Sequence, residues 1–284
     1  MRTVWLNGEW LPANEARVSI FDRGLLFGQG VYEVSPVLDG HFCNWPHHAA
    51  RLARSKAVAR IGDDTDWPSV LAELIARNQL IEGRVYLQIT AGAPPDRDFL
   101  GPVPPAAPTR FAFTQEAALI DNPKAESGLK VILRPDARWD LRAAKTVQLL
   151  YAVLVKEEAR EAGVDDVWMV EDSPNGKVVT EASSSNAHII DARGVLVSHP
   201  VDHGVLPGVT RICVIEIARA MGLAVEERAF GPEELFAARE AFVSAAGSLV
   251  LPVVEVDGRV IGNGRPGPLV QAIRARYIAQ LRGG

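Results

Sequence analysis

Lys145 lies at a junction where a lysine amine could act as a nucleophile. The strand before it should end at Pro135, and the residues after it have the spacing of an amphipathic helix. The apolar positions of that helix are Leu149, Leu150, Val153 and Leu154. We expect the helix to begin near Thr146, close to the lysine, so that the helix dipole and apolar walls both disfavour the ammonium form. Such a lysine can form a Schiff base with a carbonyl compound, although this stretch alone would favour an ordinary solvated lysine.

Glu181 is a candidate partner for a cationic group. It ends a predicted strand, and alternation along that strand places Val179 and Glu181 on one face. A carboxylate at an inward strand end needs a cationic ring nitrogen, a lysine or an arginine beside it. A solvated carboxylate at the strand end explains the pattern equally well.

The segment Gly204–Leu223 could bind an anion. A glycine-containing loop leads into a predicted helix that begins at Thr210, and Gly208 allows a ligand to approach the backbone closely. The N–H groups of Val209 and Thr210, with the helix dipole behind them, would suit a phosphate. A lysine, a carboxylate and a phosphate site are the three fixed points that pyridoxal 5'-phosphate requires.

The composition excludes several other kinds of function. The chain has 284 residues, of which 48% are hydrophobic and 23% charged, and its formal net charge is -5. A mildly acidic chain without a basic cluster has no electrostatic reason to bind nucleic acid or an anionic membrane. Cys43 and Cys213 stand apart in apolar surroundings and predict buried thiols rather than a disulfide or a metal site. Without a signal segment or a long apolar run, we expect a soluble cytoplasmic protein.

The first half of the chain predicts strands, two helices and one long loop. Hairpin turns are expected at Asn7-Gly8 and Asp39-Gly40, and strands at 84–90 and 110–114. Helices are expected from Pro46, with an apolar stripe, and from Pro68 to Leu80. The stripe of the first helix consists of Ala50, Leu52, Ala57, Val58 and Ile61. Residues 91–108 are rich in proline and glycine without periodicity, so we expect a loop of functional importance.

The length and the composition predict two domains. We expect an N-terminal domain over residues 1–120, a linker over 121–128 and a C-terminal cofactor-binding domain over 129–284. The second half should contain a hairpin that turns at 173–176 and should end with a helix over Pro266–Arg282.

Six separated motifs resemble those of the fold-type IV pyridoxal-phosphate aminotransferases, the family of the branched-chain and D-amino acid transaminases. The motifs are FDRGLLFGQGVYEV at 21–34, HxxRL at His48–Leu52, RWDLRAAK at 138–145, VTEASSSN at 179–186, LPGVTR at 206–211 and AFVSAAGSLVLPV at 241–253. The resemblance covers almost the whole chain and is closest to the D-amino acid transaminases. It implies a mixed α/β fold of two domains, a smaller N-terminal α/β domain and a C-terminal domain with barrel-like β structure.

The resemblance also implies roles for the matching residues. Lys145 would form the Schiff base with pyridoxal 5'-phosphate, and Glu181 would pair with its pyridine nitrogen. Arg51 and the backbone at Val209 and Thr210 would hold the phosphate. The other positions expected at the cofactor are Gly208, Leu206 on the ring, Tyr32 near the lysine, Ser185 and Ala246, and Tyr32 is also expected to contact the substrate.

The implied reaction is a ping-pong transamination, with Lys145 as the proton shuttle. Three serines after Glu181 favour a D-amino acid donor such as D-alanine or D-glutamate, with 2-oxo acids as acceptors. His188 and Ala246 depart from the family pattern, which has an aromatic residue and a threonine there. In the long loop, Arg97 stands between two aspartates where relatives have Arg-x-His for the substrate carboxylate, so we expect weaker carboxylate selection and some turnover of (R)-amines.

Other readings remain open. The chain could be an (R)-amine or branched-chain transaminase, a lyase such as aminodeoxychorismate lyase, or a cofactor-binding carrier protein. The resemblance further implies a homodimer that acts on small molecules and binds neither nucleic acid nor membranes.

Overall fold

Two tight turns order the first strands of the chain. Asn7 and Gly8 have φ angles of 50° and 101°, and Asp39 and Gly40 have φ angles of 50° and 78°. Left-handed backbone of this kind matches the twist of two-residue hairpins. Both predicted hairpins are present, between β1 (Thr3–Leu6) and β2 (Glu9–Pro12) and between β3 (Gly30–Leu38) and β4 (His41–Phe42).

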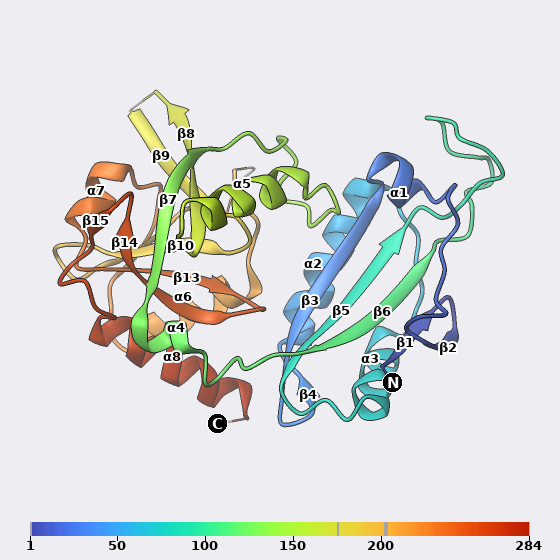
Figure 1. Ribbon diagram of the computed structural model, residues 1–284, viewed down its shortest axis with the longest axis horizontal. Helices are drawn as coiled ribbons and strands as arrows, with labels where there is room; N and C mark the ends of the chain where they lie inside the picture. The colour runs from blue at the N-terminus through green and yellow to red at the C-terminus, as the bar shows by residue number, and fades with distance from the viewer. Residues whose placement is uncertain (1, 175, 202–203, 284) are drawn as a thin grey trace. The chain divides into compact units, whose positions relative to one another are not determined.

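The computed structural model describes residues 2–174, 176–201 and 204–283. The chain divides into two compact units (Figure 1). The first contains Met1–Ala118 together with Ala144–Gln148, and the second contains Leu119–Ala143 together with Leu149–Gly284. Residues 144–148, which the sequence assigned to the C-terminal domain, therefore belong to the first unit. Helix α4 (Pro123–Ser127) lies within the segment that was expected to be a linker.

An antiparallel sheet forms the first unit. Within the described residues it has six strands in the order β2-β1-β6-β5-β3-β4. Its two remaining strands are β5 (Gly83–Thr90) and β6 (Arg110–Glu116). The short helix α1 (Arg23–Phe27) precedes β3. No helix or strand occupies residues 91–109, all of which are described, so the predicted long loop is confirmed.

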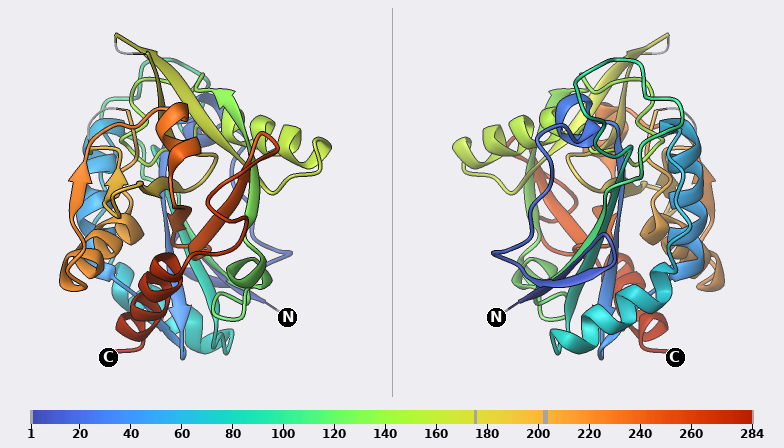
Figure 2. Two further views of the ribbon diagram at one scale, coloured as in Figure 1. Left: turned by 90° about the vertical axis from the view of Figure 1, so that its left-hand side faces the viewer. Right: turned by 90° about the vertical axis from the view of Figure 1, so that its right-hand side faces the viewer.

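Helices α2 (Trp45–Ala59) and α3 (Trp67–Arg77) cover one face of this sheet (Figures 1 and 2). The buried side of α2 is mostly polar and consists of His48, Arg51, Leu52 and Ser55. The predicted apolar stripe of α2 is therefore wrong. Among the stripe residues that lie within the helix, only Leu52 is buried, and Val58 is 48% exposed. Polar side chains that face a sheet in this way need partners there.

A curled mixed sheet forms the second unit. Within the described residues it has nine strands, ordered β12-β11-β10-β13-β14-β7-β8-β9 with β15 beside β14. The pairs β7–β8, β14–β7 and β11–β12 are parallel and the others antiparallel. The strands are β7 (Leu129–Pro135), β8 (Asp166–Ser173), β9 (Gly176–Ala182), β10 (Asn186–Ile190), β11 (Leu196–Ser198), β12 (Val225–Glu227), β13 (Glu240–Ala245), β14 (Leu249–Val256) and β15 (Arg259–Val260). This two-sheet architecture confirms the predicted fold class.

Helices pack on both sides of the curled sheet (Figure 2). Helices α6 (Val209–Ala220) and α8 (Pro268–Leu281) contact β13, whereas α5 (Leu150–Glu161) contacts β7 and β8. The short α7 (Pro232–Ala237) contacts β9. The predicted apolar stripe of α5 is wrong, since Val155 and Ala159 are buried while Leu150, Val153 and Leu154 are 73%, 51% and 46% exposed.

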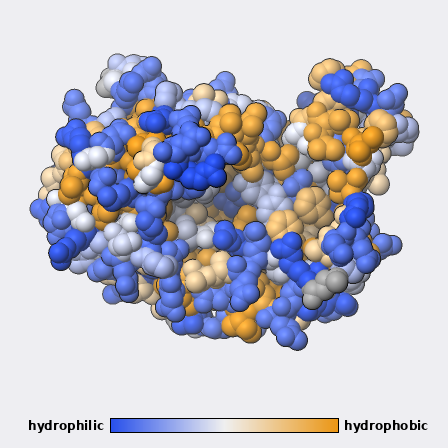
Figure 3. Space-filling view, viewed as in Figure 1, coloured by the Kyte–Doolittle hydropathy of each residue, from blue (hydrophilic) through white to orange (hydrophobic). Residues whose placement is uncertain are grey.

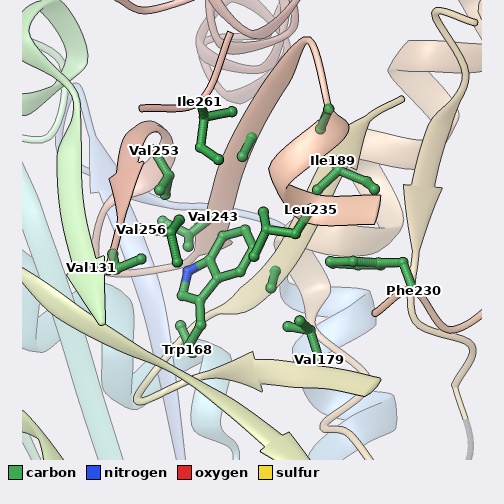
Figure 4. Packing of buried hydrophobic residues seen from close by; sticks show 14 of the residues in the cluster. Val131, Trp168, Val179, Ile189, Phe230, Leu235, Val243, Val253, Val256 and Ile261 are labelled. Carbon is green, nitrogen blue, oxygen red and sulfur yellow. The ribbon is translucent and has the colours of Figure 1, made fainter. Parts of the chain in front are cut away.

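The core of the second unit is built around Trp168 (Figure 4). Its indole is fully buried and meets the ring of Phe230 edge-on, with 6.4 Å between centroids. Val179 of β9 packs in the same cluster. Each Å2 of apolar surface removed from water stabilises the folded state by about 25 cal/mol, so the burial of these side chains stabilises the packing of strands β7 to β9. Those strands carry the polar residues described below.

Three further sequence expectations concern absences. Both cysteines are free and buried. None of the helices in the described ranges combines the length and apolar composition that a bilayer crossing requires. The described residues also contain no group of three or more His, Cys, Asp or Glu side chains that could hold a metal ion.

Candidate active site

Lys145 lies on an extended segment beside β3. Its carbonyl accepts a hydrogen bond from Tyr32 N at 3.1 Å, and Val147 N donates to the carbonyl of Gly30 at 3.1 Å. Lys145 N donates to Ser55 Oγ of α2 at 2.9 Å. Residues 144–148 thus extend the edge of the first sheet, and α5 begins only at Leu150. The predicted helix start near Thr146 is wrong, so the helix-dipole argument does not apply to Lys145.

The Lys145 amine lies over the face of Tyr32. Nζ is 4.1 Å from the ring centroid, and Tyr32 stacks on Tyr86 with 5.4 Å between centroids. An ammonium group over an aromatic face is attracted by the ring quadrupole. The Tyr86 hydroxyl is in turn fixed by Gln88, because it donates to Oε1 at 2.7 Å. The structure therefore brings together two of the residues that the sequence singled out.

Arg51 is held by a buried carboxylate that the sequence analysis missed. Its Nε and Nη2 donate to the two oxygens of Glu33 at 2.8 Å and 2.7 Å, and His48 Nδ1 lies 2.7 Å from Glu33 Oε2. Burial alone would raise the pKa of Glu33, but the contacts with Arg51 and His48 outweigh it and lower the pKa to about 2. A signal was present, because alternation along β3 places Glu33 on the same face as the buried Val31 and Val37.

Arg97 lies on the exposed loop between β5 and β6. Its guanidinium packs over Phe27 of α1 and over Phe99, 4.9 Å and 5.0 Å from the ring centroids. Among the described residues it forms no ion pair with either neighbouring aspartate. Those carboxylates accept backbone hydrogen bonds instead, from Arg97 N at 2.7 Å to Asp96 and from Leu100 N at 2.9 Å to Asp98.

Arg23 anchors this loop and was also missed. It is buried, and its guanidinium donates to the carbonyls of Asp98 at 2.6 Å and Phe99 at 2.9 Å. Its Nε donates to Gln29 Oε1 at 2.6 Å. The backbone around Arg97 is therefore tied to α1, whereas the Arg97 side chain stays at the surface.

Glu181 is buried in the second unit at the end of β9. Oε1 accepts from Arg138 Nη1, and Oε2 accepts from Asn186 Nδ2 at 3.0 Å and from Leu206 N at 3.3 Å. Burial raises the pKa of Glu181 above its usual value, and the Arg138 contact opposes that rise. The alternative of a solvated strand-end carboxylate is wrong, since Glu181 is only 4% exposed.

Arg138 connects Glu181 to a second buried carboxylate. Its Nε and Nη2 donate to Asp136 at 2.9 Å and 2.6 Å. Asp136 also accepts from Thr180 Oγ1 at 2.6 Å and lies 3.4 Å from Arg142 Nη1. A guanidinium held on a carboxylate by two parallel hydrogen bonds has little freedom to turn. Arg138 therefore presents its remaining nitrogen to Glu181 in a fixed direction.

Asn186 links Glu181 to the loop before α6. Its Nδ2 also donates to the carbonyl of Leu206 at 2.9 Å. A Cβ added at Gly208 would lie 1.9 Å from Asn186 Oδ1, so this position requires glycine. The group that approaches Gly208 in this structure is the Asn186 side chain, and the predicted approach of a ligand stays a prediction. One amide fixes both the carboxylate and the start of the helix.

The N-terminus of α6 has no side-chain cap. The helix begins at Val209, one residue before the predicted start, and Gly208 provides no side-chain cap. The first N–H groups of a helix have no intrahelical acceptor and carry the positive end of the dipole. The Thr210 hydroxyl lies 3.3 Å from the Tyr277 hydroxyl.

Two other predicted residues lie in turns of the second unit. Ser185 is half-buried, and its carbonyl accepts from Ala182 N at 2.8 Å within the turn after β9. Ala246 is half-buried in the turn between β13 and β14. Neither position shows a side-chain hydrogen bond among the described residues.

His188 replaces an aromatic residue and packs like one. It is fully buried and stacks on Phe242, with 4.6 Å between ring centroids, and its Nε2 lies 2.9 Å from Ser244 Oγ. Burial, assisted by Arg211, lowers the pKa of His188 to about 3. The ring is therefore neutral at ordinary pH.

The residues fit pyridoxal 5'-phosphate by the chemistry of their donors. The first unit supplies an amine on Lys145 and a buried guanidinium on Arg51. The second unit supplies a buried carboxylate on Glu181, bound through Asn186 to the loop before an uncapped helix end. An aldehyde, a phosphate and a basic ring nitrogen are the groups that these residues can bind.

Comparison with known proteins supports this interpretation. The family described as class IV amino-transferases matches residues 30–256. A D-alanine aminotransferase from Bacillus licheniformis is 34% identical over 276 residues, covering 95% of this chain and 94% of that protein. A D-alanine aminotransferase from Staphylococcus aureus strain N315 is 33% identical over 284 residues, covering 98% and 97%.

A solved structure with the same fold comes from a branched-chain enzyme. The branched-chain amino acid aminotransferase of Escherichia coli superposes with a TM-score of 0.87 at 25% identity, covering 99% of this chain and 95% of that one. The family match, the relatives and the fold confirm the resemblance that the motifs predicted. The chain belongs to the class IV aminotransferases and is a pyridoxal-phosphate-dependent aminotransferase of fold-type IV.

Proposed function

We propose that this enzyme transfers the amino group of D-amino acids to 2-oxo acids. The observation that carries the proposal is the end-to-end match to D-alanine aminotransferases, at 34% and 33% identity over 95% and 98% of the chain. The serines at 183–185, which resemble those of D-amino acid transaminases, support it independently. D-Alanine and D-glutamate are the expected donors.

A branched-chain L-amino acid donor is the second candidate. The fold of the Escherichia coli branched-chain enzyme superposes closely, with a TM-score of 0.87. Its identity of 25% is lower than that of the D-alanine aminotransferases, and a shared fold supports many specificities. The D-amino acid proposal is therefore the stronger one.

Lys145 is the proposed proton carrier. Pyridoxal 5'-phosphate, when bound, accepts the amino group at its aldehyde carbon and draws electrons from the substrate. Lys145 Nζ would hold the aldehyde in the resting enzyme, and after release would move the substrate's Cα proton. The amine lies 4.1 Å from the centroid of the Tyr32 ring, and this contact would hold Nζ in a fixed orientation.

Glu181 is the proposed partner of the pyridine nitrogen. A carboxylate at that nitrogen holds a proton on it, which strengthens the ring as an electron acceptor. For that role Glu181 must stay ionised although burial raises its pKa, and Arg138 opposes the effect of burial. Asn186 would keep the second oxygen fixed, through its 3.0 Å hydrogen bond.

Arg51 and the start of α6 are the proposed phosphate site. The guanidinium of Arg51 is oriented by Glu33, and the N–H groups of Val209 and Thr210 lie at an uncapped helix end. Charge-assisted hydrogen bonds of this kind are worth about 1.5 to 3 kcal/mol each. Leu206 would pack on the cofactor ring.

Arg97 is the residue proposed to bind the substrate carboxylate. The preference for substrates that carry a carboxylate is expected to be weak. Its guanidinium stacks on Phe27 and Phe99 and forms no ion pair among the described residues. Wherever the carboxylate binds away from these rings, the side chain must give up its ring contacts, which offsets part of the binding energy. Some turnover of (R)-1-phenylethylamine, which lacks a carboxylate, is therefore expected.

A homodimer is the proposed assembly. Apolar side chains cluster at the start of α5 and just before it, and Figure 3 shows hydrophobic residues on the surface there. The exposed members are Leu141, Leu149, Leu150, Val153 and Leu154. Such a patch is typical of an interaction surface.

Light scattering tests the assembly. We expect the mass of two chains, with dissociation in Leu150→Asp/Leu154→Asp but not in the control Val58→Asp on α2. A monomeric mass in an active preparation would exclude the dimer.

A donor panel tests the proposed function. Initial rates with pyruvate or 2-oxoglutarate as acceptor should be highest for D-alanine and D-glutamate and much lower for L-leucine and L-valine. Higher kcat/KM for the L-branched donors would replace the D-amino acid proposal with the second candidate.

A further inference from the structure

A histidine on the buried face of α2 is left with one ring nitrogen unbonded. His48 is 0% exposed and shares the carboxylate of Glu33 with Arg51, one helical turn further on. Its Nε2 has no hydrogen-bond partner within the described chain. A buried polar atom without a partner costs about 1 to 3 kcal/mol, so its retention calls for an explanation.

The bond to Glu33 determines what Nε2 can do. Glu33 is ionised at neutral pH, since its pKa is about 2, so Nδ1 of His48 must carry a hydrogen and donate it. Neutral His48 therefore has a lone pair on Nε2, which repels an anion. Protonated His48 has an N–H there, which would bind one.

The charges around His48 determine when it is protonated. Those that act on it are Glu33 from β3, Arg51 from its own helix and Lys145 from the edge segment. Burial lowers the pKa of His48 below its usual value, and Arg51 and Lys145 lower it further against the opposing effect of Glu33. The negative charge of Glu33 and the positive charge of Arg51 cancel. The cluster of Glu33, Arg51 and His48 therefore carries no net charge while His48 is neutral.

We propose that His48 is a second phosphate-binding group beside Arg51, and that Nε2 takes up one proton from solvent when a phosphate dianion binds. This inference rests on the phosphate site of the proposed function. The incoming dianion supplies the negative charge that makes a second buried cation favourable. The proton then forms the hydrogen bond that Nε2 lacks, while Glu33 accepts from both His48 and Arg51 and so keeps the two side chains next to each other.

Isothermal titration of the full-length apoprotein with pyridoxamine 5'-phosphate tests the proposal. This probe has no aldehyde, so Lys145 cannot bond to it. Repeating the titration in buffers of different ionisation enthalpy counts the protons taken up. His48→Asn keeps an N–H donor for Glu33 and removes only Nε2, and His47→Asn, exposed on the same helix, is the matched control.

The wild-type protein and the control should take up about one proton more than His48→Asn. Their affinity should fall about tenfold more per pH unit between pH 7 and 8 than that of the variant, as linkage requires. Protonation of the probe's ring is common to all three proteins and cancels in the comparison. Equal proton uptake with and without His48 overturns the proposal.

Nitrogen-15 NMR of histidine-labelled wild-type protein gives a readout that needs no variant. The Nε2 signal of His48 should change from the lone-pair type to the protonated type on binding, and an unchanged lone-pair signal overturns the proposal. The variant Arg51→Ala distinguishes a failure of the proposed phosphate site from a failure of this inference alone. If Arg51→Ala binds the probe as tightly as the wild type, the proposed phosphate site fails together with this inference. If Arg51→Ala binds the probe weakly, but the wild type and His48→Asn take up equal numbers of protons, only the inference fails.

Discussion

The Lys145 amine lies 4.1 Å from the centre of the Tyr32 ring, on a segment that is hydrogen bonded to β3 rather than being part of a helix. Both residues belong to the first compact unit although 112 residues separate them in the chain. The position of this amine is therefore set by sheet pairing.

Lys145→Ala should abolish cofactor-linked absorbance and catalytic turnover together. In the proposed mechanism no other lysine is available to hold the aldehyde and carry the proton. Absorbance spectra before and after borohydride, with peptide mapping of the reduced lysine, check this. Lys156→Ala, an exposed lysine of α5, is the control and should behave as wild type. Full activity in Lys145→Ala would exclude the assignment.

Glu181→Gln should retain the cofactor but slow Cα proton removal by about 100-fold, the usual loss when a preorganised charge is removed. The amide oxygen can still accept from Arg138, whereas the new NH2 group faces the donors Asn186 Nδ2 and Leu206 N, so circular dichroism of the variant is compared with that of the wild type. Single-turnover kinetics with Cα-deuterated donor measure the step. Glu158→Gln, an exposed residue paired with Arg134, should leave the rate unchanged. An unaltered rate in Glu181→Gln would make the carboxylate merely structural.

Arg97→Ala should raise the KM for D-alanine by about tenfold, because one charge-assisted contact to the carboxylate is lost. The KM for (R)-1-phenylethylamine, which has no carboxylate, should barely change. Steady-state kinetics with both donors provide the comparison, and Arg54→Ala on the exposed side of α2 is the control. Unchanged D-alanine kinetics, or a wholly inert amine, would mean that other residues bind the carboxylate.

Glu33 should link stability to acid pH. Its pKa in the folded protein is about 2, below the 4.5 of an ordinary glutamate, so its stabilisation is complete above pH 4.5 and is lost as the pH falls toward 2. Glu33→Gln should lower the free energy of unfolding by about 3 kcal/mol at pH 7 and approach wild type below pH 3. Urea unfolding at several pH values measures this. The control Glu73→Gln removes an exposed pair with Arg77 and should show no such convergence.

The motifs single out Lys145 and Glu181, whose roles stay predictions, whereas the periodicity predicted the wrong surroundings for the lysine. Leu149, Leu150, Val153 and Leu154 have helical spacing, and a helix is present there. Their side chains are exposed, and the residues before them pair with β3. Pairing between segments so far apart in the chain leaves no local signal.

Helix α2 is a second element whose buried face was predicted wrongly from its sequence. Apolar spacing predicted a hydrophobic contact face, yet His48, Arg51 and Ser55 face the sheet because Glu33 and Lys145 N supply their partners. Polar side chains that find partners on the sheet can thus replace the apolar contact face that a helix ordinarily has. The short hairpins at Asn7-Gly8 and Asp39-Gly40 were predictable because their signal is entirely local.

The most direct test of the proposed function is the half-reaction of the holoenzyme with a single donor and no acceptor. Stopped-flow absorbance should show the cofactor band disappearing with D-alanine, with one pyruvate formed per active site, and returning when 2-oxoglutarate is added. L-Leucine at the same concentration should react at least about 100-fold more slowly, the size of effect expected when a donor's groups are left unpaired. Faster conversion with L-leucine than with D-alanine would contradict the account.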